Sequence, residues 1–341
     1  MNHHSKSLKI ALATGKVLLA LGIVGYLVVK IQRDAGFSRL VNEPKEWSYL
    51  AIALAMVLTA FTCSFVRWYL LVRGLGLTFH LRDALRLGSL GFMLNQVMPG
   101  SVGGDLFKAA FIAHEQPGRR TEAVASVFID RFVGVVAMFV VASVALSFAD
   151  QTLTRSSLLS GLKVFIWAIA AGGMLGICLL TSRLISGLRA QRLVTRWPVV
   201  GPTLGRLVAG LHQFGSRRRY LVAAFVLALT THCLLVSAFW CVSRGLPITG
   251  PTFQQNATIV PLALVAGALP LTPGGLGLTE TALAKLYGAI QLNEADGALV
   301  ALGYRALTYV VAAIGACYYL SAKRRIDRLL EEAETLAEEI V

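Results

Sequence analysis

Two short segments combine a proline, several glycines and charged side chains within otherwise apolar sequence: PGSVGGDLFK at residues 99–108 and PGGLGLTE at residues 273–280. Glycine permits sharp turns and the close approach of another backbone, so each segment is predicted to break a helix. The helix after such a break presents unpaired N–H groups and roughly half a positive charge at its N-terminus. Together these features predict a site that can hold an anion.

The acids beside these breaks, Asp105 and Glu280, have two interpretations that the sequence leaves open. Asp105 could contact a transported group, or it could only cap its helix and pair with Lys108 three residues later. Glu280 lies five residues before Lys285, which is not a natural spacing for a helical ion pair. Capping or a structural ion pair is therefore the alternative to a direct role in transport.

The two glycine-rich segments belong to a longer internal match. Pro273 follows Pro99 by 174 residues, and Arg305 in GYRALTYVV follows Arg131 in FIDRFVGVV by the same number. Two features that share one offset indicate an internal repeat. A chance match within a chain of 32 glycines is the alternative.

Ionised side chains inside the apolar segments must have partners or face a hydrated cavity, because each costs about 2.5–3.5 kcal/mol at the centre of a bilayer. Asp130 and Arg131 are neighbours and point about 100° apart on a helix, so each is expected to pair elsewhere. Arg305 lies inside an apolar segment of the second copy and also requires a partner or a hydrated cavity. Arg67 is flanked by aromatic residues and is interpreted as an anchor at the membrane interface.

These residues must be positioned by membrane helices. Of the 341 residues, 56% are hydrophobic and only 15% are charged, which indicates an integral membrane protein with several spans. Stretches of about 20 mainly apolar residues predict full spans at 11–31, 49–71, 122–148, 160–181, 220–243 and 297–320.

Two further apolar stretches are too short to cross. Residues 87–98 would form roughly 18 Å of helix and residues 257–271 roughly 22 Å, against a hydrocarbon core of roughly 30 Å. Each is expected to form one arm of a re-entrant hairpin that breaks at the glycines and returns, or else a pair of short crossings. Three full spans separate the matching helices, and an odd number inverts the second copy. Inverted repeats with broken helices are typical of secondary transporters.

The basic residues predict orientation rather than nucleic-acid binding. The net charge is +14, and segment 183–219 carries eight arginines and no acid. Placing this segment, the N-terminus and the C-terminus in the cytoplasm agrees with the excess of Lys and Arg in cytoplasmic loops, although the basic loop at 30–48 then lies outside. The charged residues 322–341 are expected to form a separate cytoplasmic helix.

No metal or cofactor is predicted. The five cysteines and six histidines do not have the spacing of a zinc site or a disulfide framework. The nucleotide-binding motif G-x-x-x-x-G-K-[ST] does not occur in the sequence, which argues against direct drive by ATP.

The motifs MPGSVGGDLFKAAFIA, SVFIDRFVG, LTPGGLGLTETAL and GYRALTYVVA resemble those of the lysylphosphatidylglycerol synthase transmembrane region, also called the flippase-like domain. The likeness spans roughly residues 10–320 and implies movement of a lipid between leaflets. The separate synthase domain of the bifunctional members has no counterpart in this chain, so the resemblance does not imply synthesis. The residues that it favours for lipid binding and translocation, together with Lys108, are Pro99, Gly100, Gly103, Gly104, Asp105, Asp130, Arg131, Pro273, Gly274, Gly275, Gly277, Glu280 and Arg305.

The sequence thus predicts an all-α polytopic protein of the inner membrane with six full spans and two re-entrant hairpins. The expected domain covers 1–321, with repeat halves at 49–148 and 220–320. The expected function is translocation of a phospholipid, an aminoacylated lipid or a polyprenyl- or hopanoid-type lipid, with an anionic or glycosylated head group and without enzymatic activity. A scaffold for a lipid-synthesis enzyme and an intramembrane lipid-phosphate enzyme remain alternatives, and a homo-oligomer is left open.

Overall fold

A computed structural model describes residues 25, 29, 42–97, 103–148, 157–181, 217–269 and 271–339, with side chains except at 97, 157–162, 179–181 and 322–339. The predicted span at 11–31 lies almost wholly outside these ranges. So do the basic segment up to residue 216 and the tip of the first break, with Pro99 and Gly100.

The described ranges are helical and contain no strand. The helices are α3 (Trp47–Gly74), α4 (Leu81–Val97), α5 (Gly103–Glu115), α6 (Arg120–Ser147), α8 (Ser157–Thr181), α11 (Arg218–Gly245), α12 (Phe253–Ala268), the short 3₁₀ turn η1 (Pro273–Gly275), α13 (Leu278–Ala289) and α14 (Glu294–Glu339).

Within the described ranges, four helices are long and apolar enough to cross a membrane: α3, α6, α11 and the Glu294–Ser321 part of α14. They coincide with four of the predicted spans. A fifth predicted span, 160–181, is helical in α8. The chain is therefore a multi-pass membrane protein whose described secondary structure is helical. Beyond residue 321 helical structure continues without a break to Glu339.

Both predicted helix breaks occur. In the first half α4 ends at Val97 and α5 begins at Gly103, and in the second half α12 ends at Ala268 and α13 begins at Leu278. Both first arms begin earlier than the sequence suggested. For α12 the reason is a capping box, in which Thr252 and Gln255 each accept a hydrogen bond from the other's backbone N–H.

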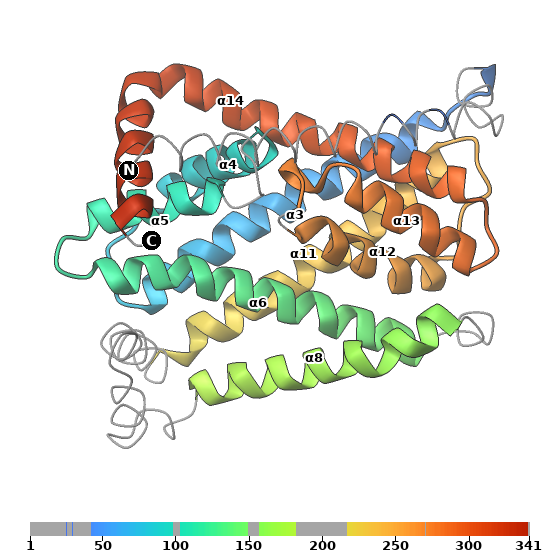
Figure 1. The fold of residues 1–341 in the computed structure, drawn as a ribbon, viewed down its shortest axis with the longest axis horizontal. Helices are drawn as coiled ribbons and strands as arrows, with labels where there is room; N and C mark the ends of the chain where they lie inside the picture. The colour runs from blue at the N-terminus through green and yellow to red at the C-terminus, as the bar shows by residue number, and fades with distance from the viewer. Residues whose placement is uncertain are drawn as a thin grey trace, which may run out of the picture.

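The order of elements is the same in both halves: a long helix, two short helices that flank a break, and a second long helix. The two leading helices, α3 and α11, pack along each other more extensively than any other described pair. Buried small residues such as Ala60 allow this close approach, and the Thr231 hydroxyl lies 3.4 Å from the Ala60 carbonyl oxygen. In Figure 1 the pair α4 and α5 lies toward one end of the molecule and the pair α12 and α13 toward the other.

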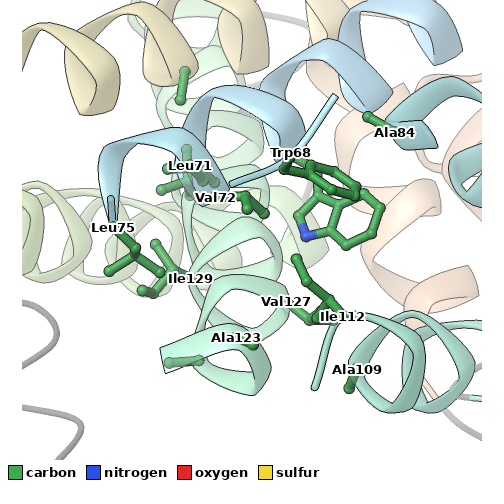
Figure 2. Packing of buried hydrophobic residues seen from close by; sticks show 14 of the residues in the cluster. Trp68, Leu71, Val72, Leu75, Ala84, Ala109, Ile112, Ala123, Val127 and Ile129 are labelled. Carbon is green, nitrogen blue, oxygen red and sulfur yellow. The ribbon is translucent and has the colours of Figure 1, made fainter. Parts of the chain in front are cut away.

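The buried side chains form a separate core at each end. At one end Trp68 and Leu71 of α3 pack with Ala84 of α4, Ile112 of α5 and Val127 of α6 (Figure 2). At the other end the core joins α3 and α11 to α12, α13 and α14. Each broken helix pair is therefore anchored by its own core and by the long helices that both cores share.

Candidate functional site

Every acid that the sequence placed in an apolar helix has a basic partner. Asp130 of α6 accepts two hydrogen bonds from Arg67 of α3, at 2.7 Å from Nε and 3.0 Å from Nη2. Both side chains are buried. The interpretation of Arg67 as an interfacial anchor is therefore wrong, because α3 turns this arginine toward the interior, where it neutralises the Asp130 carboxylate.

The next residue along α6, Arg131, forms an ion pair with Asp105 in the first turn of α5. Neighbouring Asp130 and Arg131 thus pair with different helices, which confirms the prediction made from their angular separation. The Asp105 side chain is 14% exposed, whereas that of Arg131 is 52% exposed. Arg131 is accordingly an accessible cation held by a mostly buried acid.

Lys108 is a second cation at the same acid. Its Nζ lies 3.8 Å from Asp105 Oδ1, which is within ion-pair range but beyond hydrogen-bond distance. Nζ also lies 5.4 Å from the centre of the Trp68 ring, a favourable cation–π position. The lysine side chain is only 13% exposed.

The second half contains a corresponding pair. Arg305 of α14 donates to Glu280 of α13, at 2.7 Å from Nε and 3.2 Å from Nη2. It also donates to the carbonyl oxygens of Gly274 and Gly275 at 2.7 and 3.0 Å. Four of its five N–H donors are thus occupied within the protein. Glu280 also accepts from the Gly277 N–H at 2.8 Å and is fully buried, so this pair is closed.

Lys285 takes no part in this closed pair. Its Nζ binds both carboxylate oxygens of Glu294, at 3.1 and 3.0 Å, and the lysine side chain is 63% exposed. The pairing agrees with the spacing argument against a bond between Lys285 and Glu280.

Glycines let the two arms of each broken pair approach closely. A Cβ added to Gly104 of α5 would lie 1.8 Å from the Gly91 carbonyl oxygen of α4. In the second half a Cβ on Gly275 would lie 2.1 Å from the Gly267 carbonyl oxygen, and its φ of +67° is itself unfavourable for other residues. These glycines are required for packing, whatever they contribute to ligand binding.

The two broken pairs also meet each other. Gln96, in the last turn of α4, lies close to Gly274 of η1. A Cβ added to Gly274 would lie 2.0 Å from the Gln96 Oε1 atom. Asn95 stabilises the start of α5, because its Oδ1 accepts the Gly104 N–H at 2.8 Å. Sequence reasoning missed both amides, although two consecutive amides just before a break are a signal for such capping.

The charges of the two halves differ. Five side chains form the first charge cluster, which lies within electrostatic range of Lys108: Arg67, Asp105, Lys108, Asp130 and Arg131. With all five side chains ionised, its three bases and two acids give one excess positive charge. The matching contact in the second half joins one acid to one base, Glu280 and Arg305, and is neutral. An anion is therefore favoured at the first cluster, and its accessible group is Arg131.

In the part of the chain that the structure describes, no three His, Cys, Asp or Glu side chains gather in a way that could hold a metal ion. Within the described ranges the five cysteines form no disulfide. Gly103 and Gly104 are the first two residues of α5, and Pro273 is the first residue of η1.

Comparison with known proteins supports the resemblance. The sequence model of a family described as the lysylphosphatidylglycerol synthase TM region matches residues 17–315. The chain is also similar to the UPF0104 membrane protein MJ1595 of Methanocaldococcus jannaschii, with 20% identity over 344 aligned positions that cover 94% of this chain and 98% of the relative.

Proposed function

Because the chain belongs to the family of the lysylphosphatidylglycerol synthase transmembrane region, we propose that it is a lipid translocase rather than an enzyme. It moves the polar head group of an anionic lipid between the two leaflets while the acyl or prenyl tails remain in the hydrocarbon. The observation that carries this proposal is the pair of matching acid–arginine contacts at two broken helix pairs, of which one is accessible and the other closed.

The proposed topology follows from the same arrangement. With six full spans and two re-entrant hairpins, α4 and α5 enter from the cytoplasm and α12 and α13 from the opposite side. Basic residues gather at the first of these ends: Arg73, Arg82, Arg86, Arg119 and Arg120. Arg217 donates to the Arg73 carbonyl oxygen there at 3.1 Å, so the start of α11 lies at the same end. Both termini are then cytoplasmic, and the protein resides in the inner membrane.

In the proposed transport cycle, the arginines of the two halves, Arg131 and Arg305, differ in which one is accessible to a head group. In the conformation described here Arg131 is open to a head group, and Arg305 is held by Glu280 and two carbonyl oxygens. Exchange of the two arrangements would close the first pair and open the second, which is the way that inverted repeats alternate access. The excess positive charge near Arg131 favours a phosphate-containing head group, whether on a phospholipid, an aminoacylated lipid, or a polyprenyl- or hopanoid-type lipid.

The test is leaflet exchange of a fluorescent phosphatidylglycerol in liposomes that hold the purified protein. A membrane-impermeant reductant quenches only the outer leaflet, so translocation appears as extra loss of fluorescence. We expect exchange with the wild type and with the control Lys285→Gln, and a strong reduction with Arg131→Gln. Exchange that survives Arg131→Gln in correctly inserted protein would refute the role of Arg131.

Two other measurements separate the alternatives. An enzyme would change the labelled lipid chemically in detergent, where there are no leaflets. A scaffold would leave both leaflets undisturbed and would instead retain a lipid-synthesis enzyme on co-purification.

A further inference from the structure

The strongest unexplained feature is that Asp105 has two cations where Glu280 has one. Arg131 contacts the Asp105 carboxylate directly. The Lys108 Nζ lies 3.8 Å from Asp105 Oδ1 and sits over the Trp68 ring. Neither the repeat nor the capping of α5 requires this lysine.

The second half has no equivalent of the extra cation. Three residues after Glu280 stands Leu283, which is fully buried, whereas three residues after Asp105 stands Lys108. Glu280 instead receives the Gly277 N–H, a donor that cannot leave. Lys108 is thus specific to the half with the accessible arginine.

An anionic head group that binds Arg131 takes away the arginine partner of Asp105. Its phosphate competes with Asp105 for the guanidinium group, and a carboxylate left alone in a mostly buried position is strongly unfavourable. Lys108 can replace Arg131 as the cation that neutralises Asp105. A small rotation of its flexible side chain closes the 3.8 Å gap and neutralises Asp105 as Arg131 turns to the ligand.

We propose that Lys108 is an exchangeable counter-ion, which replaces Arg131 at Asp105 when the phosphate of an anionic lipid binds Arg131. The inference rests on the proposed function and names the ligand class more closely. With its five side chains ionised, the first charge cluster has one excess positive charge, so one phosphodiester with a single negative charge makes it neutral. A pyrophosphate would leave it negative. Lys108 acts through Asp105 and Arg131 and is therefore a positioning residue.

The test measures binding, so that its outcome is independent of transport. Purified protein in neutral detergent is titrated with phosphatidylglycerol, and with phosphatidylcholine as a zwitterionic control, while the thermal unfolding midpoint is followed. For Lys108→Met we expect about tenfold weaker binding of phosphatidylglycerol, equivalent to about 1.4 kcal/mol. Lys108→Arg keeps the charge and should restore most of the affinity. Lys285→Met is the matched control on an exposed lysine.

The decisive variant is the double change Asp105→Asn with Lys108→Met. Without the acid, Arg131 needs no replacement, so the double variant should bind phosphatidylglycerol more tightly than Lys108→Met alone. Asp105→Asn by itself should bind more tightly than the wild type, which keeps the test valid even if Lys108→Met does not fold. Unchanged binding in Lys108→Met, or weaker binding in Asp105→Asn, would overturn the inference. If phosphatidylglycerol binds as expected but never changes leaflet, the proposed function fails and the counter-ion exchange stands.

Discussion

Replacing Glu280 by Gln should destabilise this protein far more than a comparable change at an exposed ion pair. The carboxylate accepts from Arg305 Nε at 2.7 Å, from Arg305 Nη2 at 3.2 Å and from the Gly277 N–H at 2.8 Å. It is fully buried, and the Arg305 side chain is 9% exposed. The neutral amide has a single acceptor oxygen and turns its NH₂ group toward donors.

The expected loss of unfolding free energy depends on the hydrogen bonds that Arg305 keeps after the substitution. Removal of one partner of a buried ion pair typically costs about 3–5 kcal/mol. Arg305 keeps its two bonds to the carbonyl oxygens of Gly274 and Gly275, which places the expected loss near the lower end, about 3 kcal/mol. The control Lys285→Gln breaks a pair on an exposed lysine, for which about 0–1 kcal/mol is expected.

The assay is the apparent unfolding temperature in detergent, taken from the monodisperse fraction that survives heating. Glu280→Gln should unfold well below both the wild type and Lys285→Gln. The double change Glu280→Met with Arg305→Met should unfold above Glu280→Gln, because an apolar pair leaves no unpaired buried charge. If Glu280→Gln and Lys285→Gln proved equally stable, the closed pair would not be the stabilising contact that its geometry implies.

Two further predictions concern the first half. Gly104→Ala should separate α4 from α5, since its Cβ would collide with the Gly91 carbonyl oxygen at 1.8 Å, whereas Gly172→Ala on α8 meets no atom within 4 Å and should be tolerated. A cysteine-accessibility or thermal-stability comparison of these two variants is the check, and equal behaviour would contradict the close-packing argument. Arg67→Gln should cost about 3–5 kcal/mol because it leaves Asp130 buried without its cation. Recovery on adding Asp130→Asn, followed by thermal unfolding, would confirm this cause, and an unfolding temperature equal to that of the wild type would disprove it.

The features that could be predicted from the sequence are those set by local composition and spacing. Apolar stretches of about 20 residues identify the long helices, because lipid offers no hydrogen-bond partners and a helix pairs its backbone groups internally. Proline and clustered glycines identify the breaks before α5 and α13. The angle between neighbouring helical residues was enough to separate the partners of Asp130 and Arg131.

The identity of each partner was decided by the tertiary structure. Arg67 and Asp130 are 63 residues apart, and nothing in their local sequence distinguishes a buried arginine from an interfacial one. The sequence match between Arg131 and Arg305 also concealed their main difference, since one is accessible and the other is held by a carboxylate and two backbone oxygens. Helical spacing determines which way a side chain points, but only the packing of α3, α5, α6 and α14 determines which charge it meets and whether solvent can reach the pair.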